Sequence, residues 1–443
     1  MAGPLIFTPG RGALTSTAAP SRPAAAPASL ATDDSPPLHL PGAHFTVAFG
    51  ALLLGSAGLV VAAPELALGQ VFSPRLLGVV HLFTLGWITT SILGALCQFL
   101  PVAIGVPLYS RSAAYGTLAL HGLGLTLFVG GLLAGAPSVF RIGALVVAVG
   151  LTVFAGNLAL TLARAKTRDV TFYALALADV FLLGTIVLGG MLAWNLHSGA
   201  LLGADRFTVL AVHIHVALAG WVVMVMVGVA HRLLPMFLLS HGASERPAQV
   251  AVATLGVGSG LLLLPVGHLG RVIAGALIAL GIGAFLVQAV LFVRHRRRRA
   301  IDPGLKLALA GLVGLGAATL VAPFALHGGL ASLRLLVAYV LLALVGAIST
   351  FIAGHYYKIV PFLVWYHRFG PLIGERQVPK VAELFSARVA GVTVVLAVLG
   401  TCAMLAGVAL ESPSVLRGGA LAFAAAMVVE AAQMVMIARR RPT

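Results

Sequence analysis

His81, His213 and His215 lie within long apolar stretches of the chain, where an imidazole is the side chain most able to do chemistry. An ionisable group inside a membrane span is costly and by default indicates a function. Neutral imidazole is also the commonest nitrogen ligand of haem iron. His213 and His215 are two residues apart, hence about 200° apart around a helix, and cannot share one metal as an i, i+4 pair does. Each of the two therefore needs a different partner.

His81 and His215 begin the same pattern of residues. Counted from each as zero, a glycine follows at +5, a tryptophan at +6, a glycine at +13 and a proline at +20: Gly86, Trp87, Gly94 and Pro101, and again Gly220, Trp221, Gly228 and Pro235. A third copy, counted from Leu341, keeps both glycines and the proline but lacks the histidine and the tryptophan. A fixed spacing in three segments 134 and 126 residues apart is an internal repeat. The repeat predicts that His81 and His215 lie at one depth.

The composition indicates a polytopic membrane protein, because 60% of the residues are hydrophobic, 9% are charged and the mean hydropathy is +1.05. A helix that spans a bilayer needs roughly 20 apolar residues. We expect an all-α fold of about twelve such helices in three four-helix units, with the repeat helix second in each. Residues 1–43 are rich in Ala, Pro, Ser and Thr and predict a disordered tail before a membrane domain over 44–440. The expected spans are 44–64, 76–103, 112–135, 138–163, 171–195, 206–238, 247–266, 269–294, 304–327, 333–363, 384–410 and 413–438.

The distribution of the +16 net charge indicates how the chain crosses the membrane, and it does not indicate nucleic-acid binding. The N-terminal tail, the loops after even-numbered spans and the C-terminus hold 22 of the 28 Lys and Arg residues. Basic loops stay cytoplasmic, so we expect a multi-pass protein of the cell (cytoplasmic) membrane with both termini in the cytoplasm. The basic runs 296–299 and 439–441 are expected to contact lipid headgroups. The three histidines then lie in the outer half of the membrane.

Two interpretations of these histidines remain open. In the first, a haem is held between the second and sixth spans, and the glycines at +5 and +13 let a flat macrocycle or a neighbouring helix come close. In the second, each imidazole bonds a facing carbonyl and the glycines serve ordinary helix packing. The candidate cofactor residues are His81, His213, His215, Gly86, Gly220, Trp87, Trp221 and Tyr339, of which the histidines are the candidate metal ligands.

The segment "HIHVALAGWVVMVMVGVAHRLLP" resembles the tenth helix of subunit I of haem-copper oxidases, particularly in the cytochrome-cbb and nitric-oxide-reductase branches. That helix is roughly H-V-H-S-G-A-L-G-W-V-x(6)-G-x(6)-P. The resemblance implies that His213 binds a high-spin haem, that His215 and His81 bind a low-spin haem, and that one or two haem b groups are present. The spacing also resembles that of the NnrS family, twelve-span haem proteins linked to nitric oxide stress, whose second helix begins W-H-x-H-E-M. Only a single His81 stands there in this chain.

The chain also departs from the oxidase pattern. Its His-x-His lies in the sixth span instead of the tenth, its seventh span has no histidine, and no adjacent His-His pair occurs anywhere. The oxygen-reducing metal pair therefore cannot be assembled, which argues against a proton-pumping terminal oxidase. We expect a haem protein that binds oxygen or nitric oxide, senses it, or exchanges electrons with a redox partner protein. The alternative from another class is a permease for a metal or small solute, with its histidines along the pathway.

Other polar residues are further candidates. Tyr339 has the place of His213 in the third repeat and could bond a haem ligand or propionate, or be an interfacial tyrosine. Asp179 and Glu430 are candidates for a proton path, or for hydrogen bonding with Asn157 or Gln433. The remaining histidines give weaker expectations: a copper ion or solvation for His197, His268 and His327, rings at the headgroup level for His231 and His355, and an approach to the haem region for His121.

Overall fold

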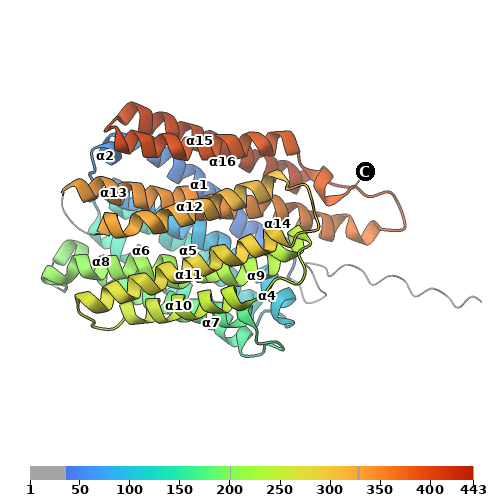
Figure 1. Ribbon diagram of the computed structural model, residues 1–443, viewed down its shortest axis with the longest axis horizontal. Helices are drawn as coiled ribbons and strands as arrows, with labels where there is room; N and C mark the ends of the chain where they lie inside the picture. The colour runs from blue at the N-terminus through green and yellow to red at the C-terminus, as the bar shows by residue number, and fades with distance from the viewer. Residues whose placement is uncertain (1–35, 200, 327–329, 443) are drawn as a thin grey trace, which may run out of the picture.

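The computed structural model describes residues 36–199, 201–326 and 330–442 (Figure 1). Within these ranges the chain forms helices joined by loops, without β-strands. Eleven of the described helices are long and apolar enough to cross a membrane, which confirms an all-α, multi-pass membrane protein. The stretch expected at 247–266 forms a shorter helix of 17 residues, about 25 Å long. The first helix begins at His39, and residues 1–35 of the expected tail lie outside the described ranges.

In chain order, the described helices can be assigned to the three units expected from the sequence repeat. The first unit contains α1 (His39–Val61), α2 (Ala63–Ala67), a bent second helix made of α3 (Pro74–His81), η1 (Leu82–Thr89) and α4 (Thr90–Ile104), then α5 (Arg111–Leu133) and α6 (Pro137–Leu162). The second contains α7 (Val170–Ser198), η2 (Gly203–Asp205), α8 (Arg206–His215), η3 (Val216–Val223), α9 (Met224–Leu238), α10 (Arg246–Leu262) and α11 (His268–Arg294). The third contains α12 (Pro303–Leu326), α13 (Leu330–Leu341), η4 (Leu342–Ser349), α14 (Thr350–Arg368), η5 (Gly370–Leu372), η6 (Val381–Leu384), α15 (Ala387–Ala409) and α16 (Pro413–Arg439).

The glycines of the repeat bring each second helix close to the first helix of its own unit. A Cβ at Gly94 would come 2.6 Å from the Cβ of His44 in α1, and one at Gly228 would come 3.0 Å from the Cβ of Ala174 in α7. In the third unit, a Cβ at Gly354 would come 2.4 Å from the backbone N of Ala308 in α12. Small residues at such contacts let helix backbones approach, which is how helices associate in a membrane.

The third and fourth helices of each unit form a close antiparallel pair, α5 with α6, α10 with α11 and α15 with α16. In each pair an amide side chain of the fourth helix accepts a backbone N–H at the start of the third. Asn157 accepts from Ser110, Gln288 from Ala248 and Gln433 from Ser386, at 2.9 to 3.1 Å. These buried amides satisfy N–H groups that a helix start leaves without partners.

The fourth helix of each unit also packs against the first helix of another unit, α6 against α7, α11 against α12 and α16 against α1. The last helix thus meets the first. Helices α2, α8 and α13 lie at one end of the bundle, at the left of Figure 1. The C-terminus lies at the opposite end.

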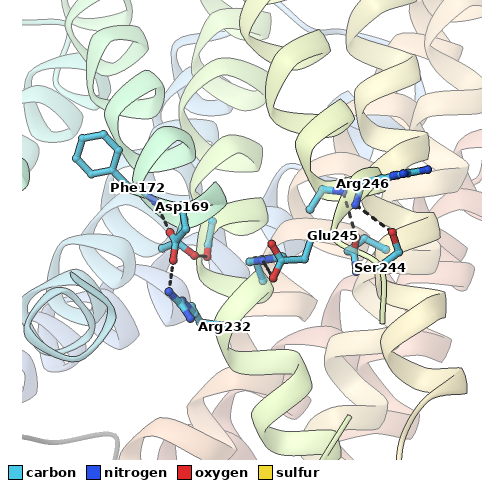
Figure 2. A network of polar contacts seen from close by, with 11 residues as sticks. Asp169, Phe172, Arg232, Ser244, Glu245 and Arg246 are labelled. Atoms are coloured by element: carbon cyan, nitrogen blue, oxygen red, sulfur yellow. Dashed lines mark hydrogen bonds and ion pairs between the residues drawn. The ribbon is translucent and has the colours of Figure 1, made fainter. Parts of the chain in front are cut away.

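Ion pairs tie the first and second helices together at this opposite end. Asp169, just before α7, pairs with Arg232 in α9 and accepts a hydrogen bond from the backbone N of Phe172 (Figure 2). In the third unit, Asp302 pairs with Lys358 in the same way. Arg232 and Lys358 both stand at motif position +17, so the ion pair belongs to the repeat.

Candidate functional site

Motif position zero of each repeat helix is followed by a π-helical segment. η1 follows His81, η3 follows His215 and η4 follows Leu341, and each has eight residues. A π-helical turn bonds residue i to i+5, and such turns are frequent at functional sites. The repeat in the sequence therefore has a counterpart in the backbone, at the same offset in all three helices.

Side chains bond carbonyl groups of two π-helical segments. Thr90 Oγ1 donates to the Leu85 carbonyl at 3.0 Å, and Thr350 Oγ1 donates to the Val345 carbonyl at 2.8 Å. Both pairs stand at motif positions +9 and +4. His121 Nε2 lies 3.0 Å from the same Leu85 carbonyl oxygen. The buried His121 ring is thus bound to the backbone of η1, which is the bonding expected of a structural histidine.

His81 ends α3 and is partly buried. Its Nδ1 donates to the Leu77 carbonyl at 2.8 Å, and its ring lies 4.8 Å from that of Phe128 in α5. A neutral imidazole that donates through Nδ1 keeps the lone pair of Nε2 for a metal, and a hydrogen bond of this kind fixes the tautomer of many metal-binding histidines. The hydrogen bond of His81 thus leaves the Nε2 lone pair unused.

His213 and His215 face different neighbours, as their spacing predicts. The His213 ring lies against Gly189 of α7, where an added Cβ would come 3.0 Å from Cε1. His215 Nδ1 bonds the Ala211 carbonyl at 2.8 Å, and its Nε2 lies 3.4 Å from the hydroxyl oxygen of Tyr339. The rings of His215 and Tyr339 stack, with their centroids 6.2 Å apart at 14°.

The contact of Tyr339 with His215 joins position −2 of one repeat helix to position zero of another. It does not join His81 to His215, so the assignment of these two as one haem pair stays a prediction. All three histidines are partly buried.

The other candidate cofactor residues pack against neighbouring helices. Trp87 is fully buried and stacks on Tyr356 with centroids 5.2 Å apart, and Trp221 meets Phe154 edge-on at 6.3 Å. A Cβ at Gly86 would come 2.5 Å from that of Ala51, and one at Gly220 would come 2.8 Å from the Phe181 ring, so helices occupy the space beside both glycines. The surroundings of these glycines and tryptophans therefore match the interpretation in which they serve ordinary helix packing.

A small cavity of about 70 Å³ lies between the three repeat helices. Its lining includes Ser91, Val225 and Phe351 at position +10 and Ala95, Val229 and His355 at position +14. Pockets for drug-sized ligands measure roughly 300–1,000 Å³, so this cavity is too small for a haem, and its walls are apolar. His355 was expected at the headgroup level; the structure instead buries it beside this cavity, because α14 continues for thirteen residues beyond it to Arg368.

The two intramembrane carboxyl groups are buried without the predicted amide partners. Asn157 bonds Ser110, and Gln433 bonds Ser386 and Tyr357. Asp179 Oδ1 and both oxygens of Glu430 have no hydrogen-bond partner among the described residues. The expectation of hydrogen bonding with Asn157 or Gln433 was wrong because those amides are used in capping helix starts.

The predicted copper cluster is not formed by the residues that the structure describes. His197 and His268 are exposed, and His327 lies outside the described ranges. No group of three His, Cys, Asp or Glu side chains converges for a metal ion within those ranges. His231 was expected at the headgroup level; it is buried at the base-rich end of the bundle, with Nε2 3.6 Å from Glu245 Oε1.

The chain was compared with models of known protein families and with curated proteins. No family model matches it, and no curated protein matches it.

Proposed function

We propose that the protein is a haem-binding integral membrane protein, with iron ligands among His81, His213 and His215. Its role would be electron transfer, or the binding of nitric oxide or oxygen. If it is an enzyme, it is a haem-dependent oxidoreductase and not a proton-pumping oxidase, since the chain has no adjacent His-His pair. Haem b supplies an iron that takes up and releases one electron or binds a diatomic gas.

The observation that carries the proposal is the donor set. His81 and His215 both donate through Nδ1 to a carbonyl one turn back, at 2.8 Å, and so keep the Nε2 lone pair. His295 makes the same bond at an exposed site, so this bond does not by itself indicate a metal ligand. What sets the candidate ligands apart is their partial burial together within apolar spans, directly before π-helical segments.

Two pairings of axial ligands follow. The resemblance to oxidase subunit I favours His81 with His215, and His81 with His213 is the second candidate pairing. Both share His81. In the second pairing the Tyr339 hydroxyl is placed to donate to His215 Nε2, whereas in the first the iron would take that lone pair and the hydroxyl would bond another acceptor, such as a haem propionate.

The wider architecture is part of the proposal. We infer three pseudo-symmetric four-helix units in a closed ring, similar to oxidase subunit I, with NnrS as the second resemblance. The contacts between fourth and first helices and the three matched π-helical segments support this arrangement. The distribution of basic residues supports insertion in the cytoplasmic membrane with both termini inside. Lipids and a redox protein are the proposed partners, and copper would be a second metal.

The test is an absorption spectrum of protein purified from haem-replete cells. We expect a Soret band and, on reduction, the sharp α and β bands of a six-coordinate haem. Replacing His81 by Ala should abolish the six-coordinate signal, and the pairing is decided by which of His213→Ala and His215→Ala does the same. His295→Ala is the control, because it removes the same type of hydrogen bond at an exposed site. A six-coordinate spectrum that survives in His81→Ala would refute the ligand assignment.

The central cavity favours a second candidate function. It lies where the three repeat helices meet and is lined by Ser91, His355 and Tyr356, which is where internal repeats of a transporter place a substrate pathway. Colourless protein from haem-replete cells would favour a permease for a metal or small solute over the haem protein.

A further inference from the structure

The walls of the central cavity come from the same face of all three repeat helices. Residues i and i+4 lie one above the other on a helix, and the cavity is lined by motif positions +10 and +14 of each, with position +11 beside them. These wall residues are Ser91, Ile92 and Ala95, then Val225, Met226 and Val229, and finally Phe351, Ile352 and His355. The cavity therefore lies where the three units of the repeat meet.

Small side chains of the first unit leave this space open. Ser91 and Ala95 stand where the third unit has the large side chains of Phe351 and His355. Side chains usually fill a protein interior to the density of an organic crystal, and an empty cavity lowers stability in proportion to its volume. A molecule that fits the cavity would therefore gain dispersion contacts with its walls without displacing a side chain.

The polar groups of the wall residues are not offered to the cavity. Ser91 Oγ and the Tyr356 hydroxyl bond each other at 2.9 Å. His355 Nδ1 donates to the Phe351 carbonyl at 2.8 Å, and its Nε2 is buried out of contact with water. The cavity surface is accordingly apolar. A buried water molecule needs about two to four hydrogen-bond partners, so a cavity of this kind stays dry and takes up apolar molecules.

Size and wall chemistry together define the class of ligand. The volume of about 70 Å³ is far below that of a site for a drug-sized molecule, so the ligand has only a few atoms. A polar molecule would lose its hydrogen bonds to water and find no replacement at the apolar walls. A small, uncharged, apolar molecule meets both conditions. Dioxygen and nitric oxide belong to this class, and xenon is an inert probe for it.

We propose that the central cavity is a binding site for a small, uncharged, apolar molecule of the size of a diatomic gas. The bound molecule makes van der Waals contacts with side chains of all three units, and no covalent bond forms or breaks. This site is separate from the candidate haem ligands, since none of His81, His213 and His215 lines the cavity. The proposal therefore goes beyond the proposed function and does not depend on haem.

The test is diffraction from crystals of the purified full-length protein under xenon pressure, because the anomalous scattering of xenon locates it. We expect a xenon peak between α4, α9 and α14, in contact with the wall residues. Ala95→Leu adds an isopropyl group at the wall and should remove this peak. Ala103→Leu is the matched control, because it makes the same change at another partly buried position of α4 that does not line the cavity. It should keep the peak.

Val225→Ala enlarges the cavity from the second unit and should raise the xenon occupancy, which tests the proposal even if Ala95→Leu does not fold. A cavity without xenon in the wild-type protein would overturn the proposal. Ordered water there, or the elongated density of a lipid or detergent chain, would overturn it as well. Equal xenon occupancy in wild type, Ala95→Leu and Val225→Ala would show that the gas binds elsewhere. The haem spectrum of the same samples succeeds or fails independently of these results.

Discussion

At the scale of the residue, one aspartate at the start of a first helix has two tasks. Asp302 Oδ1 accepts the backbone N–H of Leu305 at 3.2 Å, which caps α12, and its other oxygen pairs with Lys358. Asp169 caps α7 and pairs with Arg232 in the same way. Because the base stands on the second helix, each aspartate fixes the start of one helix against a neighbour.

Asp302→Ala should therefore destabilise the protein more than Asp302→Asn. The alanine variant loses a cap of about 1 kcal/mol. It also leaves Lys358, whose side chain is 13% exposed, without its partner, so we expect a total loss of about 2–4 kcal/mol. Asparagine keeps the capping oxygen and loses only the charge. Thermal unfolding in detergent, followed by circular dichroism, measures the difference.

Glu411→Ala serves as the control for this comparison. Glu411 pairs with Arg334, and both side chains are about half exposed, so its loss should cost no more than about 1 kcal/mol. Equal melting temperatures for Asp302→Ala and Glu411→Ala would contradict a dual role of Asp302.

Spacing predicted part of the candidate site at this scale. Two residues of separation were enough to predict that His213 and His215 face different neighbours. Which neighbours they face depends on how the second helices lie beside one another, and no local pattern encodes that. The contact between Tyr339 and His215 and the complete burial of Glu430 therefore became visible only in three dimensions.

At the scale of the element, glycines of one helix differ in how closely a neighbouring helix approaches them. On α6, a Cβ at Gly143 would come 2.2 Å from the backbone N of Phe128 in α5, whereas one at Gly156 would meet nothing within 4 Å. Backbone atoms cannot swing aside as side chains do. An added methyl group at Gly143 must push the two helices apart.

Gly143→Ala should thus lower the free energy of unfolding by about 1–3 kcal/mol, the usual cost of overpacking. Gly156→Ala, in the same helix, should be neutral or stabilise by up to about 1 kcal/mol, because alanine is the better helix former. Denaturant unfolding of both variants in the same detergent provides the comparison. Equal stability of the two would show that α5 and α6 are not packed as closely as described.

Helices were predictable where a local signal begins or ends them. Pro247 stands at the start of α10 and Pro265 follows its end, which explains why this helix is shorter than the expected span 247–266. The π-helical segments carry no such signal in the composition. One of them also takes part in a tertiary contact, the bond of His121 to the Leu85 carbonyl.

At the scale of the whole molecule, charge and connectivity give two kinds of information. The alternation of basic and base-poor loops predicts which ends of the helices lie together and a charge difference between the two ends of the bundle. The packing of α16 against α1 has no counterpart in any local pattern, because it joins residues separated by almost the whole chain. The repeat predicted three units but not how they meet.

The orientation in the membrane follows from this charge difference and can be tested directly. In a background with Cys97→Ala and Cys402→Ala, single cysteines replace Ser244, in the exposed loop between α9 and α10, or Ser414, at the exposed start of α16. The loop at Ser244 belongs to the set that holds 22 of the 28 basic residues, so we expect it in the cytoplasm. A membrane-impermeant maleimide added to intact cells should label Ser414→Cys and spare Ser244→Cys until the membrane is permeabilised. The reverse pattern would place the three histidines in the inner half of the membrane.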